Sequence, residues 1–138
     1  MSPYRMLFPA GNRSFPAMRW VNILLRTVHL IGVAGLAGAY LYEVAPEEWR
    51  PYLWLTLISG IGMIAVSLYA NGVWLLQLRG QVILFKLLLL LFMLWWPVYK
   101  LELGLAVIVL SSVIAHAPGN LRYYSPWHRR RIDSIGAK

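Results

Sequence analysis

The chain has 138 residues, of which 59% are hydrophobic and 13% charged, and its formal charge is +8. This composition is too apolar for an ordinary soluble domain, and the length favours one domain, so we expect a membrane protein. Cysteine is absent, which excludes disulfides, iron–sulfur clusters and thiolate metal sites. A metal or haem would need other donors, and the only imidazoles are those of His29, His116 and His128.

The basic residues flank the apolar stretches of the sequence and do not form a continuous basic face. This distribution is typical of charges that set membrane topology and contact anionic lipid. We therefore expect membrane lipid among the partners, with anionic headgroups at the basic tail, and no nucleic acid.

Residues 1–18 are predicted to form a loop-rich arm at the membrane surface. Prolines and a glycine are scattered through this segment: Pro3, Pro9, Gly11 and Pro16. Arg13 and Arg19 precede a long apolar stretch that has no small-residue cleavage site. The segment therefore lacks the layout of a secretory signal, and we expect it to be retained.

The first apolar stretch, residues 20–42, is long enough to cross the ~30 Å hydrocarbon core of a bilayer. Arg26 and His29 lie near its start, three positions apart, so they are neighbours on one face of a helix. An ionisable group at membrane depth is costly and usually faces protein or a water-filled cavity. Both residues are therefore candidates for a functional site.

Small residues four positions apart follow in the same stretch, as the pairs Ala34/Gly38 and Gly35/Ala39. Such pairs let a neighbouring helix approach closely, and helix packing is the interpretation that we favour. The alternative is that they make room for a flat cofactor.

Three further apolar stretches complete the chain, separated by short turns. Asn71 and Gln77 fall at the end of the second stretch and will need hydrogen-bonding partners. Lys86 lies in the third stretch, and His116 ends the fourth just before a Pro-Gly break. The predicted helices are 52–76, 82–98 and 101–117.

The Lys/Arg bias predicts the orientation. Both termini and the second turn are rich in arginine, whereas the other two turns hold only Arg50 and Lys100 beside four glutamates. The positive-inside rule then places both termini on the cytoplasmic side of the membrane, which we expect to be a bacterial inner membrane. We predict an all-α, multi-pass protein: a four-helix antiparallel transmembrane bundle over residues 19–118 and a basic, aromatic cytoplasmic tail over 119–138.

This topology brings Arg26, His29, Lys86 and His116 to one layer in the cytoplasmic half of the bundle. Two interpretations remain open. In one, the cations extend to lipid phosphates and His116 only caps a helix end. In the other, His29 and His116 are axial ligands of haem b, or flank a porphyrin, while Arg26 and Lys86 bind its carboxylates.

Other functions are also open. Copper could use the same imidazoles as metal ligands, together with the thioethers of Met63 and Met93, although methionines in apolar helices usually pack. A non-catalytic accessory or assembly subunit is the main alternative. Its small-residue faces and basic tail would contact a larger membrane complex, another copy of the chain, or anionic lipid.

Two motifs carry a resemblance to known proteins. They are Arg26-Thr27-Val28-His29-Leu30-Ile31-Gly32 and the segment from Gly80 to Leu89, which holds Lys86. They resemble the copper resistance protein D family and the HemJ-type bacterial protoporphyrinogen oxidases. The resemblance implies a small helical membrane protein in which His29 and Lys86 serve porphyrin binding or redox chemistry. The ending from Ser111 to Ser125 departs from both patterns and is typical of another family.

Overall fold

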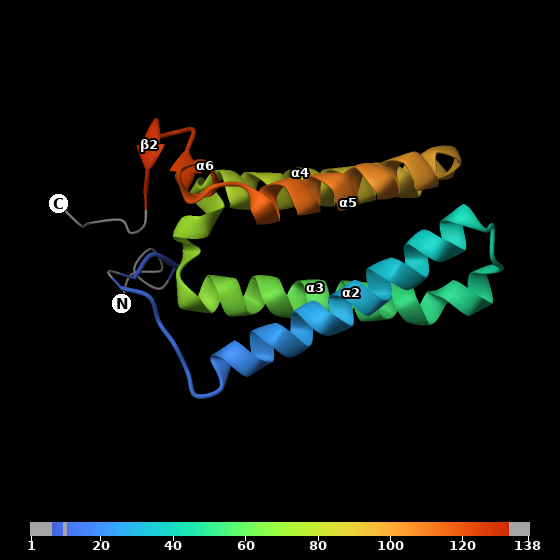
Figure 1. Cartoon of the computed structure of the whole chain (residues 1–138), viewed down its shortest axis with the longest axis horizontal. Helices are drawn as coiled ribbons and strands as arrows, with labels where there is room; N and C mark the ends of the chain where they lie inside the picture. Colours follow the sequence, from blue (N-terminus) through green and yellow to red (C-terminus); the bar gives the residue numbers. More distant parts are fainter. Residues whose placement is uncertain (1–6, 10, 133–138) are drawn as a thin grey trace. The chain divides into compact units, whose positions relative to one another are not determined.

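The computed structural model describes residues 7–9 and 11–132. Most of this chain is helical, and four helices are long and apolar enough to cross a membrane. The all-α class is thus confirmed, and the arrangement is compatible with a helical bundle (Figure 1). The helices are α2 (Met18–Leu41), α3 (Pro46–Ala70), α4 (Leu78–Trp95) and α5 (Lys100–His116), the last preceded by the 3-10 helix η2 (Pro97–Tyr99).

The chain divides into two compact units. The first unit, Ser14–Ala70, is the hairpin of α2 and α3. The second unit joins Met1–Arg13 to Asn71–Lys138 and contains the hairpin of α4 and α5. Each predicted site residue therefore belongs to one of two hairpins.

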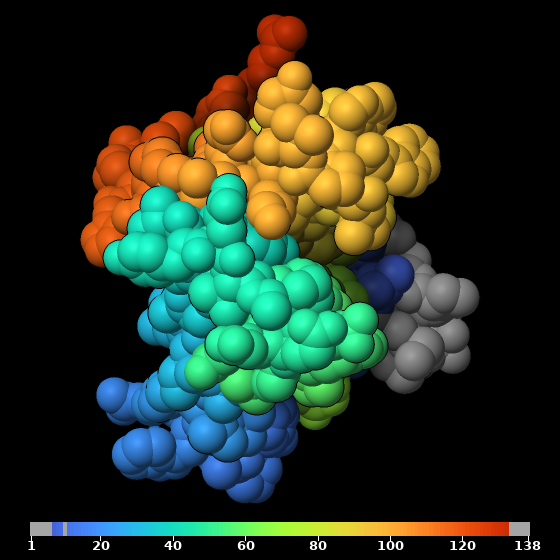
Figure 2. Space-filling view, turned by 90° about the vertical axis from the view of Figure 1, so that its right-hand side faces the viewer, coloured from blue at the N-terminus to red at the C-terminus, as the bar shows by residue number. Residues whose placement is uncertain are grey.

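Helices α2 and α3 pack closely because glycine removes side chains from their interface. A Cβ atom on Gly32 would lie 2.7 Å from the Thr56 nitrogen and 2.9 Å from the Tyr52 carbonyl oxygen, and one on Gly35 would enter the Tyr52 ring. The two helices cross at an angle (Figure 1), and the turn between them is the end facing the viewer in Figure 2, in cyan and green. Of the two predicted small pairs, Gly35/Ala39 is the one that packs on α3.

The second predicted helix has different bounds from 52–76. Helix α3 begins earlier, at Pro46, and stops at Ala70, because Asn71 is extended (φ −175°, ψ 120°) and its side chain accepts a hydrogen bond from the Val73 nitrogen. A 3-10 helix, η1 (Gly72–Leu76), follows. The bounds predicted for the second and third helices leave a tight turn at Leu78–Gln81, and this turn is wrong, because α4 already begins at Leu78.

Helices α4 and α5 run alongside each other (Figure 1). Pro97 lies two residues after the last residue of α4, as expected of a residue that cannot continue a helix. Helix α5 ends at His116, close to the predicted 117, and Pro118 caps the next element. The predicted third and fourth helices are thus present, with the third starting four residues earlier than 82.

The tail is folded against residues 71–77, the linker between the two hairpins. Its described part contains a short helix, α6 (Gly119–Arg122), and an antiparallel ribbon of β1 (Tyr124–Ser125) and β2 (Arg130–Arg131). Ile132, directly after β2, is buried, and its carbonyl accepts a hydrogen bond from the buried Gln77 side chain. This small β element was not expected from the sequence.

Candidate functional sites in the two hairpins

His29 lies on the face of α2 that packs against α3. Its Nδ1 is 3.0 Å from the carbonyl oxygen of Thr56 and 3.1 Å from Oγ of Ser59, which is itself buried. Gly60 gives the ring its space, because a Cβ atom there would lie 3.3 Å from Cε1 of the imidazole. The imidazole is therefore held between the two helices.

These contacts define which ring nitrogen of His29 carries the hydrogen. A carbonyl oxygen can only accept, so Nδ1 is the donor in the neutral ring and the lone pair is on Nε2. The Ser59 hydroxyl donates to the Leu55 carbonyl and is thus an acceptor toward His29. An Nδ1–H bond to a backbone carbonyl is the usual arrangement of a histidine that binds a metal through Nε2.

Arg26 lies one turn before His29 on the same helix, which agrees with the neighbour spacing expected from the sequence. Its side chain is exposed, whereas that of His29 is half-buried. Arg26 is therefore accessible to an anion at the side of α2.

Lys86 connects the helices of the second hairpin. Its Nζ donates a hydrogen bond of 2.9 Å to Oγ of Ser111, and that hydroxyl donates to the Val107 carbonyl of its own helix. The Lys86 side chain is half-buried on α4. The ammonium group of Lys86 has three hydrogens, and the hydrogen bond to Ser111 uses one of them.

His116 is exposed at the last position of α5. Its Nδ1 lies 2.9 Å from the Ser112 carbonyl one turn earlier, so in the neutral ring the lone pair is again on Nε2. His116 lies five residues beyond the Lys86 partner, which is about 7.5 Å along the helix axis. Lys86 and His116 thus belong to the same hairpin but lie at different heights along its helix axis.

The four predicted residues are divided equally between the units: Arg26 and His29 lie in the first, Lys86 and His116 in the second. Within residues 7–9 and 11–132, no three or more His, Cys, Asp or Glu side chains are grouped so that they could hold a metal ion. Sequence reasoning missed Ser59 and Ser111, the hydroxyls that bond His29 and Lys86. The available signal was that each is a polar residue inside a long apolar stretch.

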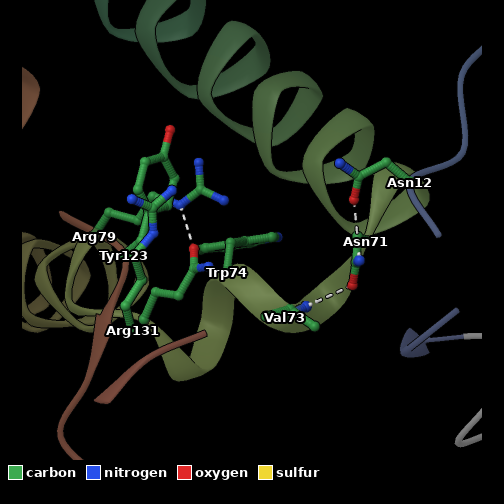
Figure 3. Close-up of a pocket in the computed structure, with 8 residues that line it drawn as sticks. Asn12, Asn71, Val73, Trp74, Arg79, Tyr123 and Arg131 are labelled. Atoms are coloured by element: carbon green, nitrogen blue, oxygen red, sulfur yellow. Dashed lines mark hydrogen bonds between the residues drawn. The ribbon is translucent and has the colours of Figure 1, made fainter. Parts of the chain in front are cut away.

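A polar pocket in the second unit was not predicted as a site. Its volume is about 360 Å³. The sequence had shown Asn71 and Gln77 as polar groups in need of partners, and the structure gives Asn71 a bond to Asn12 and Gln77 bonds to Ile132 and Arg79. The lining residues are Asn12, Asn71, Val73, Trp74, Gln77, Arg79, Tyr123 and Arg131 (Figure 3).

Comparisons with protein-family models, with curated proteins and with solved structures found no match for this chain.

Proposed function

We propose that this is a multi-pass protein of a bacterial inner membrane with both termini in the cytoplasm. The four long apolar helices support membrane insertion, and large side chains such as Leu94 and Trp95 are exposed within their hairpin. The second hairpin supports the orientation. Arg79 and the basic tail lie at its open end, whereas Glu102 lies near its closed end (Figure 1).

Within that setting we propose that the protein binds haem b or a related porphyrin. The observation that carries the proposal is the Nδ1–H bond from His29 to the Thr56 carbonyl, which holds the imidazole between the two helices in the tautomer that binds a metal through Nε2. His116 has the same tautomer and would be a second ligand. The resemblance of the motifs around His29 and Lys86 to porphyrin-oxidising membrane proteins supports the same choice.

The cations have a separate task in this proposal. Arg26 is exposed on the same helix as His29, and Lys86 retains ammonium hydrogens beyond the one given to Ser111. Guanidinium and ammonium groups suit the propionates of a porphyrin. A bound haem would supply one-electron chemistry at its iron. The chain's own residues would hold the ring, orient it and neutralise its carboxylates.

The absorption spectrum of the full-length protein, purified in mild detergent and supplied with haemin, tests the proposal. We expect a Soret band that His29→Gln removes, because glutamine keeps a polar side chain of similar length but has no imidazole nitrogen that could bind the iron. His128→Gln is the matched control and should leave the band unchanged, since His128 is exposed and its partner among the described residues is Ser125, in the tail.

Three results would contradict the proposal: no haem or protoporphyrin uptake, an unchanged spectrum in His29→Gln, or equal loss in His128→Gln. Metal analysis of the same preparation tests the copper alternative. Copper that co-purifies at a stoichiometric level and is lost in His29→Gln would replace haem as the assigned ligand.

An accessory role in a larger membrane complex, or self-association, is the second candidate. The observation that favours it is that Gly38 has no atom within 4 Å of an added Cβ and Ala34 is exposed, so this small-residue pair is not covered within its hairpin. Co-purification with a membrane protein, or a homo-oligomer, that Gly38→Ile disrupts would support this role. A Gly11→Ile variant is the control.

A further inference from the structure

The polar pocket is built from segments that are far apart in the sequence but belong to one unit. Asn12 comes from the N-terminal segment, Trp74 from η1, Arg79 from the start of α4, and Tyr123 and Arg131 from the tail. In Figure 3 the ring of Trp74 extends between two groups of side chains. Arg79, Tyr123 and Arg131 lie on one side, and Asn12 and Asn71 on the other.

Positive charge is concentrated on the first side of the pocket. The Cζ atoms of Arg79 and Arg131 lie 4.9 and 5.2 Å from the centre of the Tyr123 ring, and that of Arg122 lies 5.2 Å away. None of the described lining residues is a carboxylate. Three guanidinium groups thus lie around one tyrosine ring at this wall, and such groups suit an anionic ligand.

The arginines around Tyr123 change the pKa of its phenol. The hydrogen bond from Arg122 is the main cause that lowers the pKa of its phenol, and the charges of Arg122, Arg79 and Arg131 lower it further. The pocket wall therefore stabilises negative charge.

Trp74 supplies an independent indication of a ligand. Only 6% of its surface is exposed, and its indole nitrogen Nε1 has no hydrogen-bonding partner among the described residues. A buried donor without an acceptor is unfavourable, and native proteins usually avoid it. Because Trp74 lines the pocket, a ligand oxygen there would satisfy the indole hydrogen.

Gln77 orients part of the cationic wall. Its buried side chain accepts a 2.6 Å hydrogen bond from Nε of Arg79 and donates to the carbonyl of Ile132. The Arg79 guanidinium and the strand that carries Arg131 are thereby linked to the same amide. The Arg79 guanidinium and the backbone next to Arg131 are thus held in place before a ligand binds.

We infer that this pocket binds a phosphate group, carried either by the headgroup of an anionic phospholipid or by a soluble phosphate ester. Arginine matches phosphate oxygens with paired N–H donors, and the indole and amide hydrogens add neutral donors. The pocket lies where the apolar helix α4 begins, the level expected for lipid phosphates if the helix enters a membrane. The inference does not rest on the proposed porphyrin.

Native mass spectrometry of the detergent-solubilised full chain with phosphatidylglycerol or phosphatidylcholine tests the lipid source. We expect preferential retention of phosphatidylglycerol. Arg131→Gln should weaken this binding about tenfold, because a hydrogen-bonded charge pair is lost. Arg130→Gln is the matched control: it removes the same charge from the adjacent strand position, which faces the opposite side and does not line the pocket.

Trp74→Phe keeps an aromatic ring but removes the indole donor, and it should also weaken binding. Trp127→Phe, at an exposed position outside the pocket, should not. Arg131→Lys keeps the charge without the paired donors and should bind at an intermediate level. This variant separates loss of binding from loss of folding.

Thermal stabilisation by glycerol 3-phosphate tests the soluble source. If glycerol 3-phosphate stabilises the wild type but not Arg131→Gln, and displaces phosphatidylglycerol, the ligand is a soluble phosphate ester. If glycerol 3-phosphate neither stabilises the protein nor displaces bound phosphatidylglycerol, the ligand is the lipid. The inference is overturned if neither probe binds, or if Arg130→Gln weakens binding as much as Arg131→Gln.

Discussion

Lys86 of α4 donates a hydrogen bond of 2.9 Å to the hydroxyl of Ser111 on α5, and this contact joins the two helices of the second hairpin by their side chains. Ser111 in turn donates to the Val107 carbonyl, so its oxygen lone pairs face the ammonium. Lys86, the one lysine of α4, thus forms its hydrogen bond with a neutral hydroxyl.

Ser111→Ala should destabilise the second hairpin. The substitution removes the acceptor from a half-buried ammonium, and we expect a loss of about 1–3 kcal/mol in the free energy of unfolding. Denaturant unfolding in detergent, followed by circular dichroism, measures this change. Ser112→Ala is the matched control, because Ser112 is exposed and contributes only its backbone carbonyl to His116. Equal effects of the two variants would show that the Lys86 contact does not stabilise the hairpin.

Gly32→Ala should weaken the first hairpin. The new methyl group would meet the backbone nitrogen of Thr56 at 2.7 Å, which backbone atoms cannot easily relieve, and the expected cost is roughly 1–3 kcal/mol. Gly38→Ala, in the same helix, adds a methyl group to open space and should stabilise the helix by about 0.5–1 kcal/mol. Thermal unfolding of both variants measures the difference. If Gly32→Ala is as stable as Gly38→Ala, the close packing of α2 on α3 is wrong.

Gln77→Ala should release the tail from the linker. The substitution leaves the Ile132 carbonyl and Nε of Arg79 without the buried amide, at a cost of about 1–3 kcal/mol. Limited digestion with trypsin should then cut at Arg129–Arg131 faster than in the wild type. Gln81→Ala, which loses only a bond to the Leu75 carbonyl, is the control and should not accelerate this cleavage.

The first tyrosine to ionise should be Tyr123. Because the neighbouring arginines lower its pKa below the ordinary 10.0, its phenolate forms in the folded protein before it would in the unfolded chain. The resulting stabilisation of the folded tail is complete above pH 10 and is lost as the pH falls through the lowered pKa. An ultraviolet titration of tyrosinate should show an early step that Tyr123→Phe removes. Tyr124→Phe should keep that step, and its loss there would contradict the assignment.

The sequence predicted the helical fold well because long apolar stretches and their prolines depend on local composition. Pro97 follows the third helix, and Pro118 follows the fourth, as local chemistry requires. The end of α3 was placed too late because Leu75 and Leu76 continue the apolar pattern of the stretch. Instead, the extended Asn71 caps the following 3-10 helix through the Val73 nitrogen, and its side chain also donates to Asn12, which is distant in the sequence.

Part of the candidate site could also be predicted. His29 was identified because an imidazole in an apolar stretch is unusual, and the structure adds that Thr56 and Ser59 hold its Nδ1. The joint use of His29 with Lys86 and His116 stays a prediction. The phosphate pocket was not predicted, because none of its residues forms a motif with its sequence neighbours.

By itself, the sequence determined four apolar helices, the concentration of arginine near their ends and the unusual position of His29, since hydropathy and charge are properties of each segment alone. Only the tertiary structure decided the tautomer of His29, the partner of Lys86 and the meeting of Trp74 with Arg79 and Arg131. Those features depend on hydrogen bonds and close packing between residues that the chain brings together only when it folds.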